Sequence, residues 1–431
     1  MTSSVDGLVS GLSTSSLISQ LMSVEKAPQD ALKTKVTAEN KVISAYQSVN
    51  TKMSSLQTAA HALTLDTTWQ AVKASSSSDA VVASASPAAP TGDVTFDVKA
   101  LARAQVSTAA APADGSVPSS IDISIGGGTA THITVTTNTA QGLADAVNAA
   151  GVGVRASVVT TDQGSKLQFT ATKTGYVNRF GITGLSGVTD VVVAADARIQ
   201  VGDPAAGGYT VSSATNTFAN AIPGVTLTAN RVQDGVTVSV GADADGMADK
   251  MQSMVDAANA ALSEISGQSA YNATTRSGGP LQSDYTVREL AQNILGKVGQ
   301  GRSGYGSFKQ LGVELDRGGR LTFDRGAFLA AYKADPTRVK SAVQTGLAKA
   351  LDDAASAATD SATGSLTLAI QGGNSLVKNL NDQISDWDIR LQARQEGLQK
   401  QFASLEVALG KLKDQSSWLS GQIASLPSRS S

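Results

Sequence analysis

The chain has 431 residues, of which 41% are hydrophobic and 4% aromatic, and its formal net charge is −2. This length predicts two to four domains, and the composition predicts cores built from aliphatic rather than aromatic side chains. The near-neutral charge argues against non-specific binding to nucleic acid or acidic membranes, and the absence of cysteine excludes disulfides, thiolate metal sites and a cysteine nucleophile.

The start of the chain carries no recognisable cleavable signal. Met1 to Ser16 has neither the charged segment nor the continuous apolar segment of a secretory signal peptide. No apolar run approaches the roughly 18 residues that a membrane span requires. These features predict a soluble chain, and secretion would require an export pathway that reads an uncleaved N-terminus.

Residues 1 to about 66 are expected to be helical. Pro28 interrupts the apolar pattern, which predicts a break or a new helix start there, and 33–65 is expected to form one long helix. An irregular apolar stripe precedes this proline, at Leu8, Leu12, Leu17, Leu21 and Val24. A regular stripe with alternating steps of four and three residues follows it, at Val42, Tyr46, Val49, Met53, Leu56, Ala60 and Leu63.

The middle of the chain has the pattern of β-structure. Alternating apolar residues predict strands at 81–98, and an Ala/Pro/Ser/Gly-rich connection follows at 105–120. Residues 121–184 predict a module in the order strand, strand, helix, strand, strand. Further along, 225–229 is expected to pair with 236–240 as a hairpin.

Helical periodicity returns from about residue 247, and a second helix is expected at about 284–298. A hairpin is expected at 311–323, because alternating apolar residues flank Arg317-Gly318-Gly319. Asp324 is then expected to cap a helix that ends near Pro336.

The most regular pattern is a seven-residue repeat at the C-terminal end. It runs through Ile384, Leu391, Leu398, Leu405, Leu412, Leu419 and Leu426, with Phe402, Leu409 and Ile423 four residues after a leucine. This is the spacing of a coiled-coil seam, interrupted at Asp388, Gln395 and Ser416. The partner helix comes either from a bundle within the chain or from a neighbouring subunit. Two helical ends around a β-like middle favour a rod with an inserted head.

Candidate chemical sites are few. His61 and His132 have no clustered ligands around them, so both are expected to be structural or surface residues. Residues 243–246 resemble the start of a calcium loop but lack its later ligands. The glycines at 126–128 precede a strand rather than a helix, which predicts a turn and not a phosphate site. The sequence therefore predicts no metal, no cofactor and no enzyme activity.

Several short segments carry a resemblance when they are taken in order. They are VDGLVSGLST at 5–14, ISQLM at 18–22, AQGLADAVN at 140–148, KLQFT at 166–170, IPGVTL at 222–227, GRLTFD at 319–324 and QFASLE at 401–406. This series resembles the flagellar filament cap protein family, also called hook-associated protein 2 or FliD. The module at 121–184 is similar to a repeat shared among flagellin and hook-associated proteins.

The resemblance implies a secreted protein at the distal tip of the bacterial flagellum. Members of the family form a ring of identical subunits, commonly five-fold, which helps arriving flagellin fold and insert and prevents its loss. The implied partners are the chain itself, flagellin, the hook–filament junction protein and an export chaperone that binds the C-terminal helix. No cofactor and no nucleic acid are implied.

The expected fold is a multidomain α+β chain in which the terminal helices form a coiled-coil or bundle leg and antiparallel β-rich heads are inserted between them. Four domains are expected: 1–35 with 400–431, 36–70 with 246–399, 71–105 with 190–245, and 106–189. The residues expected to bind partners or other copies are Leu8, Leu12, Leu17, Leu21, Val42, Val49, Leu56, Ile384, Leu391, Leu398, Phe402, Leu405, Leu409, Leu412, Leu419, Ile423 and Leu426.

Two other functions are compatible with these sequence features. One is another axial flagellar protein, either a flagellin or a hook–filament junction protein, which would share the terminal helices and the repeat. The other is a surface adhesin whose β head binds a host surface through glycans. A flagellin would polymerise by itself into filaments, whereas a cap would stop at a closed ring.

Overall fold

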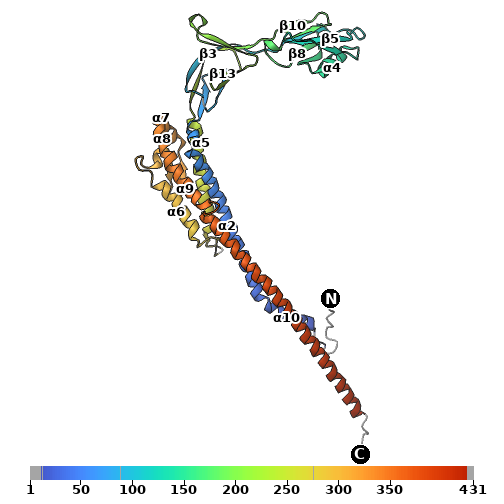
Figure 1. Cartoon of the computed structure of the whole chain (residues 1–431), viewed down its shortest axis with the longest axis vertical. Helices are drawn as coiled ribbons and strands as arrows, with labels where there is room; N and C mark the ends of the chain where they lie inside the picture. The colour runs from blue at the N-terminus through green and yellow to red at the C-terminus, as the bar shows by residue number, and fades with distance from the viewer. Residues whose placement is uncertain (1–10, 12, 88, 275, 425–431) are drawn as a thin grey trace, which may run out of the picture. The chain divides into compact units, whose positions relative to one another are not determined.

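The computed structural model describes residues 11, 13–87, 89–274 and 276–424. Contacts divide the chain into two compact units, Met1–Leu65 with Ala248–Ser431, and Asp66–Met247. The first unit is helical and the second is rich in antiparallel strands (Figure 1). The predicted α+β class, with terminal helices on both sides of a β-rich region, is confirmed.

The helical unit contains two long helices from the two ends of the chain. Its helices are α1 (Thr14–Glu25), α2 (Ala27–Thr64), α5 (Ala244–Ser269), α6 (Tyr285–Gly299), η3 (Phe308–Leu311), α7 (Arg325–Ala334), α8 (Pro336–Ala342), the π-helix η4 (Val343–Leu347), α9 (Ala348–Thr359) and α10 (Ser365–Ala424). Pro28 lies in the first turn of α2, where its missing N–H has no helical acceptor, so the predicted helix restart is confirmed.

The core of the helical unit forms around α2, which packs against α9 and α10. Val49, Met53, Leu56 and Leu63 of α2 are fully buried. The crossing of α2 and α10 is close at Gly373, where an added Cβ would lie 2.7 Å from Cγ1 of Ile43. Gly373 therefore leaves room for the side chain of Ile43 against the backbone of α10.

A short hairpin joins α6 to α7 and is anchored to α5. Its strands are β18 (Val313–Leu315) and β19 (Leu321–Phe323), which pair antiparallel as predicted. The side-chain amide of Asn259 donates to the carbonyl of Leu321 at 2.8 Å and accepts from its N–H at 2.9 Å. Asp324 accepts from the N–H of Ala327 at 3.0 Å, which confirms the predicted cap of α7. A second pair, β16 (Tyr271–Asn272) with β17 (Ser277–Gly278), follows α5.

The β-rich unit begins with the short helix α3 (Asp66–Trp69) and contains two sheets that share one core. The strands are β1 (Val72–Ser76), β2 (Val81–Ala85), β3 (Gly92–Ala100), β11 (Ala197–Val201), β12 (Tyr209–Ser213), β13 (Thr217–Ile222), β14 (Val225–Ala229) and β15 (Gln233–Ala242). Their orders are β1-β15-β3-β11-β12 and β13-β14-β2. Phe96, Val98, Ile199 and Phe218 are buried between them.

The predicted hairpin between 225–229 and 236–240 is wrong. β14 pairs with β13 and β2, whereas β15 pairs with β1 and β3. Both strands still bury alternate side chains in the same core. Alternation identifies the buried face of a strand but not its hydrogen-bonded neighbour. The segment between these strands leads from one sheet to the other, with the N–H of Asn230 donating to the carbonyl of Ala80 at 2.8 Å.

The remaining strands form the module predicted at 121–184, and its element order is confirmed. Its elements are β4 (Val106–Ala110), β5 (Ser120–Ile125), β6 (Thr131–Thr134), α4 (Ala140–Ala150), β7 (Val154–Thr161), β8 (Gly164–Ala171), η1 (Tyr176–Asn178), β9 (Phe180–Thr183) and β10 (Thr189–Val192). Outside this module, the short helix η2 (Pro204–Ala206) connects β11 to β12. The sheets have orders β10-β4-β8-β7 and β6-β5-β9. Thr139 caps α4 by accepting from the N–H of Gly142 at 3.0 Å.

Candidate functional site: the terminal helices

The N-terminal helix α1 lies along α10 and buries part of its heptad face. Ile18 and Met22 pack with Leu391 and Leu398 in one buried cluster, and Trp387 and Phe402 flank it. We call this cluster the inner seam. Ile384, another predicted seam residue, is half-buried. The structure thus brings the first part of the C-terminal heptads together with the N-terminal end of the chain.

The residues that α1 contributes to the inner seam are not Leu17 and Leu21, whose role in binding partners or other copies stays a prediction. Leu17 and Leu21 are 37% and 47% exposed, whereas Ile18 and Met22 are buried. The two pairs are adjacent in sequence and have the same four-residue spacing, so periodicity alone did not separate them. Gln29, seven residues after Met22, is buried as well, but a polar side chain at that position gives no sequence signal for the buried row. Leu8, Leu12 and Leu426 lie outside the described residues.

The predicted residues of α2 pack inside the helical unit. Val49 and Leu56 are fully buried and Val42 is half-buried. Tyr46 is buried as well, and its hydroxyl donates to the carboxylate of Asp284, which caps α6. Burial and this hydrogen bond raise the pKa of Tyr46 above its usual value. These side chains hold the bundle together, and their contacts lie within the chain.

Polar side chains fix the alignment of the inner seam. The Nε2 of Gln29, which is 2% exposed, donates to Oδ1 of Asp388 at 2.6 Å and to the carbonyl of Ile384 at 3.3 Å. Nζ of Lys33 donates to Oε1 of the same glutamine at 3.0 Å. A buried amide without partners is costly, so a shift of α10 against α2 would be penalised. The break in the heptads at Asp388 is therefore a register-setting contact.

A second polar pair lies one step further along the inner seam. Nε of Arg394 is 3.4 Å from Oε1 of Glu25, at the end of α1. Both side chains are about half exposed, so this pair contributes little to stability. Gln395, the other predicted interruption, is exposed.

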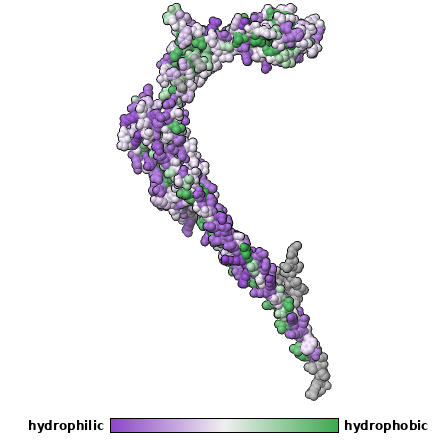
Figure 2. All heavy atoms as spheres, viewed as in Figure 1, coloured by the Kyte–Doolittle hydropathy of each residue, from purple (hydrophilic) through white to green (hydrophobic). Residues whose placement is uncertain are grey.

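Beyond Phe402 the heptad face of α10 is largely bare. Leu405, Leu412, Leu419 and Ile423 are 49%, 60%, 54% and 62% exposed. We call these four residues the distal stripe. Leu409, in the same row, is half-buried. Apolar residues of distal α10 are visible on the surface in Figure 2. The regular heptads therefore continue past the part of the helix that α1 covers.

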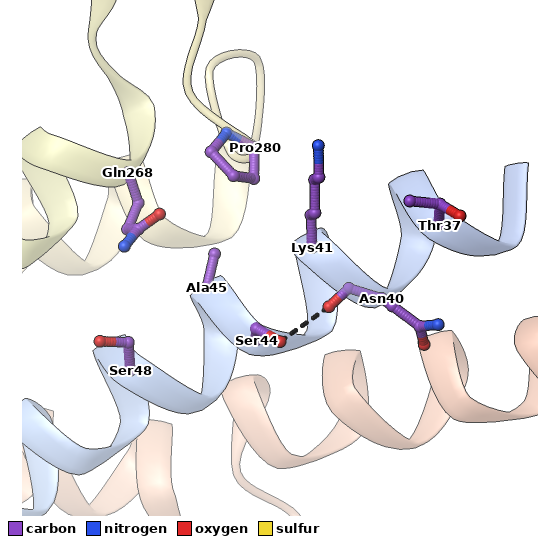
Figure 3. Close-up of a pocket in the computed structure, with 8 residues that line it drawn as sticks. All are labelled: Thr37, Asn40, Lys41, Ser44, Ala45, Ser48, Gln268 and Pro280. Atoms are coloured by element: carbon purple, nitrogen blue, oxygen red, sulfur yellow. Dashed lines mark hydrogen bonds between the residues drawn. The ribbon is translucent and has the colours of Figure 1, made fainter. Parts of the chain in front are cut away.

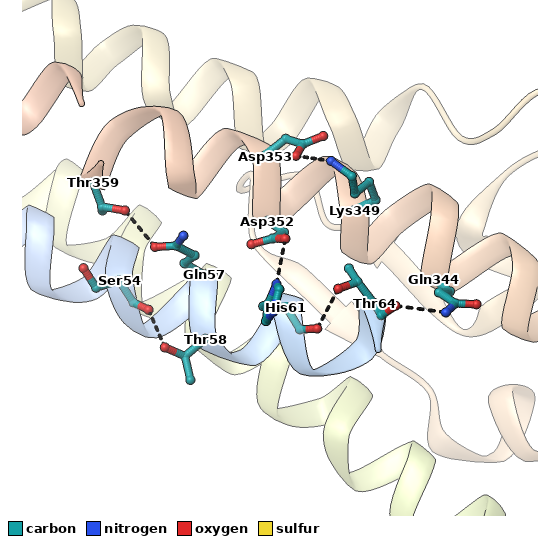
Figure 4. A network of polar contacts seen from close by, with 10 residues as sticks. All are labelled: Ser54, Gln57, Thr58, His61, Thr64, Gln344, Lys349, Asp352, Asp353 and Thr359. Carbon is teal, nitrogen blue, oxygen red and sulfur yellow. Dashed lines mark hydrogen bonds and ion pairs between the residues drawn. The ribbon is translucent and has the colours of Figure 1, made fainter. Parts of the chain in front are cut away.

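Polar contacts also join α2 to α9 near the C-terminal end of α2 (Figure 4). Nδ1 of His61 lies 3.2 Å from Oδ2 of Asp352, and Thr359 donates to Oε1 of Gln57 at 2.9 Å. Nε2 of Gln344, within the π-helix η4, donates to the carbonyl of Thr64 at 2.9 Å. These contacts give His61 a structural role and secure the last turn of α2.

A polar groove of about 600 Å³ lies between α2, α5 and the segment that contains Pro280 (Figure 3). Thr37, Ser44 and Ser48 of α2 line one side of it, and Gln268 of α5 lies on the other. The lining holds no carboxylate and no histidine, so its amine and hydroxyl groups have no acid–base partner within the groove. Within the described residues, no three His, Cys, Asp or Glu side chains come together as metal ligands. No helix in that part of the chain is long and apolar enough to cross a membrane.

Comparisons with protein-family models decide the family. A model of the flagellar hook-associated protein 2 C-terminus matches residues 194–414, which include most of α10. A model of the corresponding N-terminus matches 10–105, and the flagellin hook IN motif matches 120–173. The chain belongs to the flagellar hook-associated protein 2 family. The predicted family is confirmed.

Curated relatives align with most of this chain. The B-type flagellar hook-associated protein 2 of Pseudomonas aeruginosa is 28% identical over 416 residues, covering 87% of this chain and 88% of the relative. Flagellar hook-associated protein 2 of Escherichia coli K12 is 24% identical over 467 residues, covering 96% of this chain and 97% of the relative. The crystal structure of the D1-D2-D3 domains of the flagellar cap protein FliD from Escherichia coli aligns with a TM-score of 0.54 and 24% identity, over 77% of this chain and 99% of that one. This structural likeness supports the fold.

Proposed function

We propose that this chain caps the distal end of the flagellar filament by docking the bare part of α10 among the helices of other subunits at the tip. It is a flagellar cap protein by family, and its place is the filament tip. The observation that carries the docking proposal is the distal stripe, which continues the heptads of the inner seam but has no described helix over it.

The energetics favour docking of this stripe. Fully burying a leucine contributes on the order of 1.5–3 kcal/mol, and each of the four side chains is roughly half buried already. Covering the rest of the stripe contributes a few kcal/mol in total, on the order of half the full value for each residue. A contact of this strength holds a leg in place and still allows release when a new subunit enters. The α10 seam is therefore suited to repeated attachment.

The assembly that we propose has a structural and not a catalytic role. Several copies form a ring, commonly five in this family, and the ring retains exported flagellin while it folds and inserts. The hook–filament junction protein is the partner on which the first cap sits, and an export chaperone binds α10 before secretion. The exposed distal stripe supports such a chaperone contact, because an uncovered apolar helix face needs protection before assembly.

The four-domain division also belongs to this proposal. Residues 1–35 with 400–431 would form the part of the leg nearest the filament core, and 36–70 with 246–399 the bundle around α2. Residues 71–105 with 190–245 would form a β-sandwich, which is the pair of sheets that share one core. Residues 106–189 would form the module that contains the matched hook IN motif. This division is supported by the separate buried clusters of the sandwich and the module.

The test is deletion of the gene and complementation with the full chain. We expect absent or stunted filaments and abundant flagellin in the medium, with both defects reversed by complementation. Filament length is measured by electron microscopy, and released flagellin by immunoblot of the culture supernatant. Normal filaments with little free flagellin in the deletion strain would contradict the capping role.

A further inference from the structure

A hollow of about 540 Å³ lies between α8 and the turn that follows α6. Two guanidinium groups, those of Arg302 and Arg338, line it together with one carboxylate, that of Asp335. The other polar side chains of the lining carry hydroxyl groups and belong to Ser303, Tyr305, Thr337 and Ser341. We call this site the basic hollow. It shares no residue with the inner seam or the distal stripe, so the capping proposal leaves its role unassigned.

The turn at 302–306 holds Arg302 against α8. The N–H of Arg302 donates to the carbonyl of Gly306 at 2.9 Å, and the N–H of Gly306 donates back to the carbonyl of Arg302 at 2.8 Å. Gly306 has a φ of 98°, in the region that favours glycine, which lets the turn close. Nη1 of Arg302 donates to the carbonyl of Ser341 and lies 3.2 Å from its hydroxyl. The first guanidinium is therefore positioned before a ligand arrives, which lowers the entropic cost of binding.

The second guanidinium lies on an aromatic ring. Cζ of Arg338 is 5.1 Å from the centroid of the Tyr305 ring. Stacking of this kind leaves the N–H groups at the edge of the guanidinium free to donate. In the described part of the chain, no carboxylate forms an ion pair with Arg302 or Arg338. The carboxylate of Asp335 instead accepts from the backbone N–H of Arg338 at 2.9 Å, as the cap of α8. Donor groups of both arginines thus remain available to an acceptor from outside the chain.

The segment that contains the basic hollow carries an excess of positive charge. Residues 288–349 include 11 Lys or Arg and 5 Asp or Glu, a net charge of +6. The whole chain carries −2, so the remaining residues together carry −8. Such a local excess attracts acidic partners and repels basic ones. The charge therefore indicates an anionic ligand.

We propose that the basic hollow binds an aspartate or glutamate side chain that is carried on a segment of a partner protein. Arginine and carboxylate form charge-assisted hydrogen bonds, which are among the stronger hydrogen bonds in proteins. Asp335 reduces the net charge of the lining to +1, which suits one carboxylate better than a phosphate group with a charge near −2.

The size and exposure of the hollow favour a side chain on a polypeptide over a free small anion. About 540 Å³ is enough for an acidic side chain and the backbone beside it. Ser303 and Thr337 are exposed, so their hydroxyls can bond the amides of a bound segment. Burial raises the pKa of Tyr305 above its usual value, which keeps its hydroxyl a donor at neutral pH. This contact is independent of the α10 docking in the proposed function.

Binding of an acidic peptide to the purified full chain tests this proposal. Saturation-transfer NMR is recorded with N-acetyl-Gly-Glu-Gly-amide and with the same peptide carrying glutamine in place of glutamate. We expect a dissociation constant on the order of 1–10 mM for the glutamate peptide, and binding at least about tenfold weaker for the glutamine peptide. Equal binding of the two peptides would overturn the proposal. So would displacement of the glutamate peptide by inorganic phosphate at a lower concentration than by acetate.

Matched variants locate the binding to the hollow. Arg338→Ala should weaken binding of the glutamate peptide about tenfold or more, with an unchanged melting temperature because Arg338 is exposed. Arg317→Ala is the control, since it removes the same charge from the exposed turn between β18 and β19 and should change binding by less than about twofold. Arg338→Lys keeps the charge but loses the planar fork, so it should retain only part of the affinity. Equal losses in the two alanine variants would reduce the effect to net charge and overturn the proposal.

Photocross-linking in cells identifies the occupant. In the deletion strain, p-benzoylphenylalanine replaces Thr337, whose exposed side chain lines the hollow. We expect an adduct whose linkage maps by mass spectrometry beside an aspartate or glutamate of another protein, and its loss when Arg338→Ala is added. An adduct between two copies of this chain, with a polysaccharide, or with a segment lacking acidic residues would overturn the proposal, as would the absence of any adduct. Filament length in the same cells reports capping separately, so either proposal can fail alone.

Discussion

The side-chain amide of Gln29 lies 2.6 Å from the carboxylate of Asp388, although 359 positions separate them in the sequence. This contact joins the first turn of α2 to the middle of α10, next to the inner seam. It aligns the two ends of the chain at one register.

Replacing the polar breaks should strengthen the seam and slow cap movement. We expect Asp388→Leu with Gln395→Leu to extend the apolar face of α10 and to hold the leg more tightly. Gln29→Leu is included so that no buried amide loses its partner. Filament elongation, followed by pulse labelling of flagellin, should be slower in the triple variant than in the wild type. An unchanged rate of filament elongation would show that the polar interruptions of the seam do not control the movement of the cap.

The two adjacent glycines of α10 should respond in opposite directions. Gly373→Ala places a methyl group 2.7 Å from Ile43, so we expect destabilisation of about 1–3 kcal/mol from overpacking. Gly372 has nothing within 4 Å of an added Cβ, and Gly372→Ala should stabilise the helix by up to about 1 kcal/mol through higher helix propensity. Thermal unfolding followed by circular dichroism checks both. Equal shifts in melting temperature would contradict the close crossing of α2 and α10.

Alkaline pH should weaken the helical unit through Tyr46. Burial first, and then the hydrogen bond to Asp284, raise the pKa of Tyr46 above its usual value of about 10, so the folded chain retains the proton more tightly than the unfolded chain. The resulting stability is fully present below pH 10 and is lost as the pH rises through the higher pKa of the folded state. Tyr46→Phe should lower stability at neutral pH and flatten this alkaline decline. Urea unfolding at several pH values between neutral and strongly alkaline measures the slope, and parallel slopes for the two proteins would contradict the prediction.

Charges on the distal stripe should impair capping without unfolding the chain. Leu412→Glu with Leu419→Glu changes two side chains that are 60% and 54% exposed, so the melting temperature should stay within about a degree or two of the wild type. Filaments should be shorter, with more flagellin in the medium. Leu368→Glu, at 52% exposure on the same helix, provides the control and should leave filaments normal. Short filaments in the control as well would point to a general effect of charge on α10.

Much of the local structure was predictable because it depends on neighbouring residues. The hairpin at β18 and β19, the Asp324 cap and the restart at Pro28 each follow from a turn, a cap or a missing N–H within a few positions. The order of elements in the 121–184 module follows from short periodic segments in the same way. The heptads of α10 also predicted a long helix with one continuous apolar face.

Tertiary structure decided which side chains meet. Sequence periodicity could not choose between Leu17 and Ile18, or between Leu21 and Met22, because both pairs have the same spacing; the docking of α1 on α10 made that choice. The alternation of apolar residues showed which face of β14 and of β15 is buried. It did not show that the two strands lie in different sheets, β14 beside β2 and β15 beside β3. The sequence alone determined the apolar faces of the helices and strands, since those depend on local spacing. The partner of a buried face, such as α1 for the first part of the α10 heptads, depends on contacts between residues hundreds of positions apart, and only the folded chain reveals them.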